Sequence, residues 1–110
     1  MLPKIVLASA SPARLQLLRN CGIEPDVVVS GVDEDQLVAT NNWKTASDVS
    51  QGLAAAKAFH VAELVPNGIV IGCDSVMEFA DGLHGKPGTI DIARERLHAM
   101  RGGRGWLHTG

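Results

Sequence analysis

Residues 5–14 read IVLASASPAR, a stretch in which an apolar run gives way to a serine–proline pair. The run Ile5–Ala8 predicts a buried strand. Ser11 followed by Pro12 predicts the start of a helix, because serine caps a helix N-terminus and proline suits the first turn. The stretch therefore predicts a strand that leads directly into a helix, which is a unit from which α/β folds are built.

The junction between this strand and helix is also a candidate anion site. Free backbone N–H groups and the helix dipole favour negative charge at a helix start. Ser9, Ser11 and Arg14 add two hydroxyls and a guanidinium, which are donors suited to phosphate. Taken alone, a Ser-Pro pair more often marks plain helix capping than a binding site, so the segment by itself does not decide between the two.

The rest of the chain continues the alternation of strands and helices. Apolar runs predict strands, and apolar residues at spacings of three and four predict helices. The pattern indicates an α/β fold with a mixed β-sheet and flanking helices. The expected elements are a strand at 26–29, an irregular polar segment at 30–42, a helix from Thr45 or Ser47 to about Leu64, a strand at 69–79, a hairpin turn at Asp81-Gly82, a returning strand at 83–84, a helix at 90–100 capped by Thr89, and a strand around Trp106.

Composition limits the classes of protein to which the chain can belong. It has 110 residues, 45% hydrophobic and 20% charged, which predicts one globular domain over 1–110. The net charge of 10 − 12 = −2 indicates no sequence-independent grip on nucleic acid or on an acidic membrane surface. No apolar run is long enough to predict a transmembrane helix. The two cysteines, Cys21 and Cys73, are too few for a disulfide scaffold and predict a reduced, cytoplasmic protein.

An aspartate interrupts the strongest apolar run of the sequence. Asp74 lies within residues 69–79, and a charged residue is seldom buried in a strand without a partner. If the strand continues, alternation puts Asp74 on the same face as Gly72, and its carboxylate can serve as a general base or bind a metal ion. If the strand ends at Cys73, Asp74 only opens a turn. The run supports these two interpretations about equally.

Three further charged residues are candidates of lower specificity. Lys86 stands between Gly85 and Pro87, which fix its backbone and suit a positioned phosphate contact, although a solvated loop lysine is the simpler interpretation. Glu34 belongs to an acidic run that predicts a solvated loop, or supplies one oxygen ligand to Mg²⁺. Lys57 lies in the second predicted helix and, taken by itself, is expected to be an ordinary surface lysine.

The order of these segments is more specific than any one of them. As a set, they resemble the Maf-like nucleoside triphosphate pyrophosphatases, and the resemblance spans essentially the whole chain. The blocks that carry it are Leu7–Arg14, Val32–Glu34, Leu53–Ala58, Gly72–Val76, Gly85–Pro87 and Thr109-Gly110.

This resemblance implies a Maf/ITPase-like α/β fold with two lobes around a cleft. It also implies an activity that splits a nucleoside triphosphate into the monophosphate and pyrophosphate with a divalent cation, Mg²⁺ or Mn²⁺. Carried over by position, Asp74 is the expected proton acceptor, and Glu34 the expected acidic ligand for metal or water. The expected substrate-binding residues are Ser9, Ser11, Arg14, Lys57 and Lys86. Phosphoryl transfer depends mostly on positioning and charge neutralisation, which these residue types supply.

The sequence departs from the family pattern at two positions and in length. Ala13 replaces the first of two adjacent arginines, and Ser75 stands where threonine is commoner. Family members are nearly twice as long, so we expect this chain to be the N-terminal part of a single pyrophosphatase domain. The alternatives are a non-catalytic nucleotide-binding module and a fragment that associates with itself, including as a homodimer.

Overall fold

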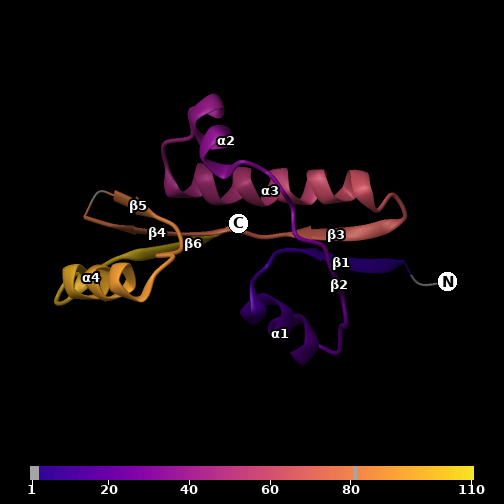
Figure 1. The fold of residues 1–110 in the computed structure, drawn as a ribbon, viewed down its shortest axis with the longest axis horizontal. Helices are drawn as coiled ribbons and strands as arrows, with labels where there is room; N and C mark the ends of the chain where they lie inside the picture. The colour runs from indigo at the N-terminus through magenta and orange to yellow at the C-terminus, as the bar shows by residue number, and fades with distance from the viewer. Residues whose placement is uncertain (1–2, 81) are drawn as a thin grey trace.

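The computed structural model describes residues 3–80 and 82–110. Strands and helices alternate as the sequence predicts, and the described part measures 52 × 34 × 21 Å. Figure 1 shows the elements spread along the longest axis. In chain order they are β1 Lys4–Ala8, α1 Pro12–Asn20, β2 Asp26–Val27, α2 Glu34–Asn41, α3 Ala46–Leu64, β3 Gly68–Gly72, β4 Ser75–Phe79, β5 Gly82–His84, α4 Ile90–Met100 and β6 Trp106–Thr109.

The strands form two three-stranded sheets. The first has the order β2-β1-β3 and is parallel, with Val6 opposite both Asp26 and Val70. The second has the order β5-β4-β6 and is antiparallel, with Met77 opposite both His84 and Leu107. The expected α/β class, with parallel and antiparallel pairing, is confirmed. The expected hairpin joins β4 to β5, although Asp81 of its turn lies outside the described residues.

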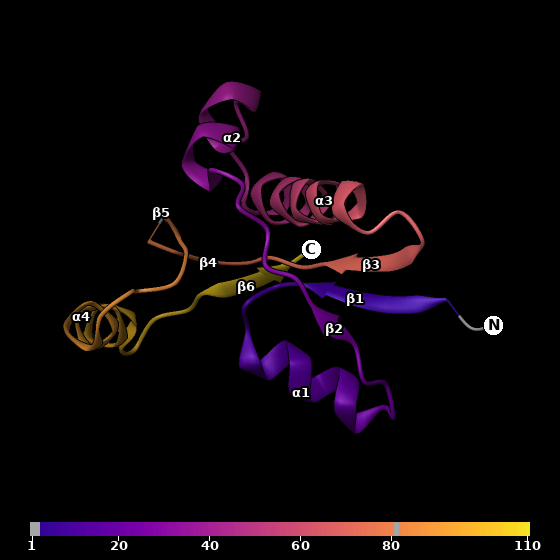
Figure 2. The same ribbon diagram turned by 45° about the vertical axis from the view of Figure 1, so that its right-hand side comes forward.

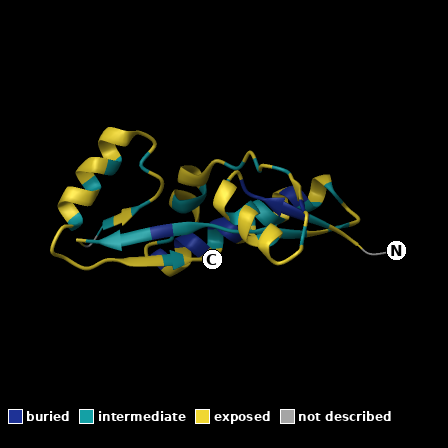
Figure 3. Ribbon diagram, turned by 90° about the horizontal axis from the view of Figure 1, so that it is seen from below, coloured by how far each residue is buried: buried dark blue, intermediate teal, exposed yellow. Residues whose placement is uncertain are grey.

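Helix α3 connects the two sheets. It runs along one side of the parallel sheet and reaches over the antiparallel one, while α1 lies on the other side of the parallel sheet (Figures 1 and 2). The N-terminal half of α3 packs on β4 in one buried cluster, and Val61 near its C-terminal end packs on β1 in a second cluster. Figure 3 shows that burial is concentrated near the middle of the molecule and that α4 is exposed or only partly buried along its whole length. No helix among the described residues is long and apolar enough to cross a membrane.

Side-chain capping fixes where the helices begin. Ser11, Thr45 and Thr89 each accept a hydrogen bond from the backbone N–H three residues further on, which stabilises the first turn. The expected starts of these three helices are therefore confirmed.

The prediction of an irregular segment at 30–42 was wrong, because this segment contains α2. Asp33 Oδ1 accepts a hydrogen bond from the Gln36 amide at 3.1 Å, so the acidic run caps a helix rather than forming a solvated loop. Two acidic residues in the first turn are favoured by the helix dipole. Leu37 and Val38 then pack against the cluster under α3, which gives the short helix a tertiary partner.

The predicted single strand at 69–79 was also wrong, because β3 and β4 belong to different sheets. They are separated by Cys73 and Asp74. Gly72 explains part of this geometry: a Cβ on it would lie 2.8 Å from the Cβ of Ala58, so only glycine lets β3 approach α3 so closely. Asp74 is therefore at the join between the two sheets.

Candidate functional site

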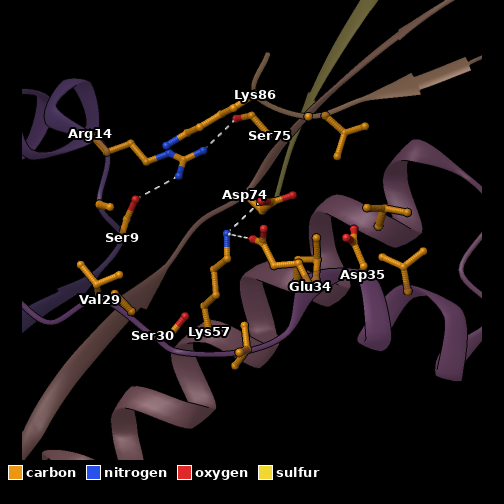
Figure 4. A pocket seen from close by; sticks show the side chains of 18 of the residues that line it. Ser9, Arg14, Val29, Ser30, Glu34, Asp35, Lys57, Asp74, Ser75 and Lys86 are labelled. Carbon is orange, nitrogen blue, oxygen red and sulfur yellow. Dashed lines mark hydrogen bonds and ion pairs between the residues drawn. The ribbon is translucent and has the colours of Figure 1, made fainter. Parts of the chain in front are cut away.

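A cleft of about 720 Å³ lies where the two sheets meet α3 and the loop before α2. Its polar side chains come from segments far apart in the sequence and point toward one another (Figure 4). The rest of its lining is apolar and comes from the loop before α2, from α2 and α3, and from β4 and β5. These apolar residues are Val29, Val32, Val38, Val49, Leu53, Val76 and Leu83.

The loop between β1 and α1 forms one wall of the cleft. Ser9 is buried, and its Oγ accepts hydrogen bonds from the Ser11 amide at 3.2 Å and from Arg14 Nη1 at 3.0 Å. Ser11 Oγ caps α1 by accepting from the Arg14 amide at 3.3 Å. Ser9 and Arg14 line the cleft, whereas Ser11 does not. Ser11, which the sequence predicts as a substrate-binding residue, therefore caps α1 and does not face the cleft.

Arg14 bridges this loop to the join between the sheets. Besides Ser9, its guanidinium donates to the carbonyl oxygen of Cys73 at 3.2 Å and to Ser75 Oγ at 3.1 Å. Cys73 and Ser75 are the two neighbours of Asp74, so Arg14 contacts the residue on each side of it, through the backbone of Cys73 and the side chain of Ser75. Figure 4 shows Arg14 turned toward Ser9 and Ser75.

A lysine and two carboxylates form the centre of the cleft. Lys57 on α3 lies with its Nζ 3.0 Å from Asp74 Oδ1 and 2.6 Å from Glu34 Oε1. The Lys57 and Asp74 side chains are 15% and 13% exposed, whereas the Glu34 side chain is 47% exposed. Lys57, which by itself predicts an ordinary surface lysine, is therefore a largely buried counter-ion of two acids (Figure 4).

The charge of Lys57 is stabilised by its partners. Burial acts to lower the pKa of Lys57, but the hydrogen bonds and charges of Glu34 and Asp74 outweigh burial and raise that pKa above its ordinary value. Lys57 therefore carries a positive charge throughout the physiological pH range and balances one of the two negative charges beside it.

Lys86 completes the set of cations. It lies in the loop after β5, lines the cleft, and extends its side chain toward Arg14 (Figure 4). Arg96 of α4 donates to the carbonyl oxygen of the adjacent Gly85 at 2.6 Å, which anchors this loop. Of the residues predicted from the sequence, Ser9, Arg14, Glu34, Lys57, Asp74 and Lys86 all line the same cleft.

Sequence reasoning missed two hydroxyl residues that support this arrangement. Ser75 Oγ, which receives a hydrogen bond from Arg14, is also 2.9 Å from Thr109 Oγ1. Their contact follows from the β4–β6 register, in which Ser75 is opposite Thr109. Both residues belong to blocks that carry the family resemblance, but the sequence alone does not predict which strand pairs with β6, so it does not predict their contact.

Glu34 and Asp74 are carboxylates of the cleft that could act as ligands for a divalent cation. Among the described residues, no group of three or more histidine, cysteine or acidic side chains could hold a metal ion. Glu34 and Asp74 nevertheless approach one common ammonium, so both face the same point in the cleft. Mg²⁺ usually takes only one or two protein carboxylates and completes its shell with water and substrate phosphate. Two carboxylates are therefore enough for a site of this kind, with Lys57 as their partner in the described structure.

Comparison with known proteins gives one consistent result. The sequence pattern of the family described as "Maf-like protein" matches residues 4–110. Nucleoside triphosphate pyrophosphatase of Rhodococcus opacus (strain B4) is 48% identical over 111 residues, covering 96% of this chain and 52% of that protein. The protein of the same name from Mycobacterium sp. (strain JLS) is 48% identical over 116 residues, covering 100% of this chain and 55% of its own length. The chain spans about half the length of the curated relatives it matches.

Proposed function

Because the chain belongs to the Maf-like protein family, we propose that it is the N-terminal part of a nucleoside triphosphate pyrophosphatase domain. The proposed reaction splits the α–β anhydride of a nucleoside triphosphate with water and gives the monophosphate and pyrophosphate. The observation that carries the proposal is the cleft at the sheet join, where a lysine-paired Asp74 lies among Arg14, Lys86 and the start of α1.

Asp74 is the proposed general base. Its carboxylate is at the centre of the cleft and is oriented by the 3.0 Å hydrogen bond from Lys57. It accepts a proton from the attacking water, which adds to phosphorus as the bond to the bridging oxygen breaks and pyrophosphate leaves. General-base catalysis of this kind supplies about 10²- to 10⁴-fold in rate. A protein that only binds nucleotide has no need for a carboxylate beside a polyphosphate.

The phosphates are proposed to lie between the β1–α1 loop and the loop that carries Lys86. Lys57 and Lys86 neutralise phosphate charge, with Arg14 at the same end of the cleft. Backbone N–H groups at the start of α1 add donors for phosphate oxygens. The apolar lining, which includes Val38, Leu53 and Val76, suits the flat face of a nucleobase.

Glu34 is proposed to hold Mg²⁺ or Mn²⁺ when the nucleotide is bound, while the Asp74 carboxylate stays free to accept the proton. The cation supplies charge neutralisation at the phosphoryl oxygens. Lys57 contacts both Glu34 and Asp74, so its ammonium balances one of their two negative charges in the described structure.

The test is pyrophosphate release from a panel of nucleoside triphosphates that vary in base, with Mg²⁺ or Mn²⁺ and with EDTA as the control. We expect release that requires the cation and is faster for some bases than for others. Retained nucleotide binding without any pyrophosphate release would favour the non-catalytic binding module instead.

Self-association is a second candidate property, and the exposed apolar surface favours it. Ile90 and Leu97 on α4 and Trp106 and Leu107 on β6 are 64–77% exposed. Large apolar side chains that are this exposed are candidates for burial in a contact with another chain. We propose a homodimer through this surface, which light scattering over a range of protein concentrations tests directly.

A cytoplasmic location is part of the same proposal. Cys21 and Cys73 are both free in the structure, and Cys21 is exposed. Free thiols persist in a reducing compartment.

A further inference from the structure

The three hydrogen bonds of Arg14 connect the first helix to the join between the sheets. Nη1 donates to Ser9 Oγ and to the Cys73 carbonyl oxygen, and Nη2 donates to Ser75 Oγ at 3.1 Å. A guanidinium has donors in a fixed planar fork, so these contacts set the relative positions of the groups they join. Cys73 and Ser75 are 59 and 61 positions away in the sequence, so Arg14 makes a long-range clamp.

The clamp continues to β6 through two hydroxyl groups. Arginine has no acceptor, so Ser75 Oγ must accept from Arg14, and its own proton is free to be donated to Thr109 Oγ1 at 2.9 Å. The neighbouring pair, Asp74 and Gly110, is joined by two backbone hydrogen bonds. The Asp74 amide donates to the Gly110 carbonyl oxygen at 3.1 Å, and the Gly110 amide donates to the Asp74 carbonyl oxygen at 2.9 Å. The segment Cys73–Ser75 is therefore held by α1 through Arg14 and by β6 through Thr109 and Gly110.

We propose that Arg14, Ser75 and Thr109 form a positioning network that fixes the backbone of Asp74 and so holds its carboxylate in the cleft. The inference rests on the proposed function only for the statement that Asp74 is the catalytic base. Catalytic groups lose rate steeply when displaced, and a misplacement of about 1 Å can cost 10²-fold. Thr109 acts here as a positioning residue, because it does not line the cleft.

Thr109→Val is the direct test, since valine keeps the branched shape and removes the hydroxyl. Thr109→Ser keeps the hydroxyl and is the conservative variant that restores the network. Thr40→Val is the matched control, because Thr40 is exposed on α2. In the ¹⁵N- and ¹³C-labelled chain, NMR follows the exchange rate of the Asp74 amide, the Asp74 ¹³Cγ resonance and the side-chain resonances of Arg14.

We expect Thr109→Val to speed exchange of the Asp74 amide about five- to tenfold, as loss of one hydrogen bond of ordinary strength implies. The Asp74 ¹³Cγ and Arg14 resonances shift with it, while Met77 and Leu107, which pair further along β4 and β6, stay protected. Thr109→Ser and Thr40→Val leave all these signals unchanged. Unchanged Asp74 signals in Thr109→Val would overturn the proposal, as would exchange that rises equally along the whole β4–β6 ladder.

Arg14→Lys serves as the second variant if Thr109→Val does not fold. Lysine keeps the positive charge but cannot reach Cys73 and Ser75 together, so we expect the same shift of the Asp74 signals. Unshifted Asp74 signals in Arg14→Lys would also overturn the network. In the pyrophosphate assay, Thr109→Val is expected to lower kcat by about tenfold or more with KM unchanged within about twofold. If the unsubstituted chain releases no pyrophosphate, the proposed function fails for this chain, while the NMR measurement still decides the network.

Discussion

Replacing Lys57 by methionine removes the ammonium that joins Glu34 to Asp74 and tests whether this contact stabilises the fold. Lys57 Nζ is 3.0 Å from Asp74 Oδ1, and the side chains are only 15% and 13% exposed. At that separation the gross attraction is about 5.5 kcal/mol for an effective dielectric constant of about 20. The cost of removing both charges from water cancels much of this gain.

The expected loss in the free energy of unfolding is about 2 kcal/mol. This lies between about 0.5 kcal/mol for an exposed pair and about 3–5 kcal/mol for a buried pair that loses one partner. The partial exposure of Glu34 limits the penalty on that side, because water can solvate its carboxylate. Most of the loss therefore comes from Asp74, which is left negatively charged and largely buried.

Urea denaturation followed by circular dichroism measures this loss as a lower midpoint at an unchanged m-value. Methionine keeps most of the length of the lysine stem, so the packing of this side chain on α3's neighbours is little altered. Lys44→Met is the matched control, because Lys44 is exposed and does not line the cleft, and it should change stability by less than about 0.5 kcal/mol. Equal urea midpoints for Lys57→Met and Lys44→Met would show that the contacts of Lys57 with Glu34 and Asp74 do not stabilise the fold.

Three other measurements test separate parts of the structure. The pKa of Lys57 is raised in the folded protein. The contribution of its charge to the free energy of unfolding is therefore fully present below the ordinary lysine pKa of 10.5 and is lost as the pH rises through the higher pKa of the folded state. The stability difference between the unsubstituted chain and Lys57→Met should thus be constant from about pH 6 to 9 and shrink only above pH 10.5, and a difference that vanishes near neutrality would contradict this. Gly72→Ala should lower stability by about 1–3 kcal/mol in thermal or urea unfolding, since the new Cβ meets α3, whereas Gly85→Ala, which has open space around it, should not. Leu97→Gln with Trp106→Gln should reduce the apparent mass in light scattering if the exposed apolar surface drives association, and an unchanged mass would exclude that surface.

Local signals in the sequence predicted much of the fold. The caps at Ser11 and Thr89 involve contacts three residues apart, so the sequence around each position contains the whole signal. The hairpin of β4 and β5 is similarly local. These features depend on short-range backbone geometry, which does not require knowledge of the tertiary structure.

The two errors arose where tertiary contacts decide the local structure. Helix α2 is short and polar, and it is stabilised by packing of Leu37 and Val38 on a cluster that α3 and β4 create. The apolar run at 69–79 continues in sequence, but the close approach of Gly72 to α3 and the pairing of Asp74 with Gly110 divide it between two sheets. Neither contact can be recognised from the run itself.

The candidate site was predicted as a set of residues but not as a set of contacts. Its members lie on separate segments, and the resemblance to a family brought them together before any geometry was known. The partners of Arg14 and the pairing of Lys57 with both acids depend on how α1 and α3 meet the sheet join. The supporting role of Thr109 depends on strand register, which sequence does not give for β6.

We propose that Asp74 is the base of a nucleotide-hydrolysing site, and the rate of pyrophosphate release by Asp74→Asn is the decisive test of that role. The rate of the variant is compared with that of the unsubstituted chain and of Asp48→Asn, an exposed aspartate outside the cleft that undergoes the same chemical change. Nucleotide binding is measured in parallel by calorimetry. We expect Asp74→Asn to lose about 10²- to 10⁴-fold in rate, with nucleotide binding kept or strengthened because one negative charge has been removed. An Asp74→Asn variant that keeps more than about a tenth of the rate would contradict that role.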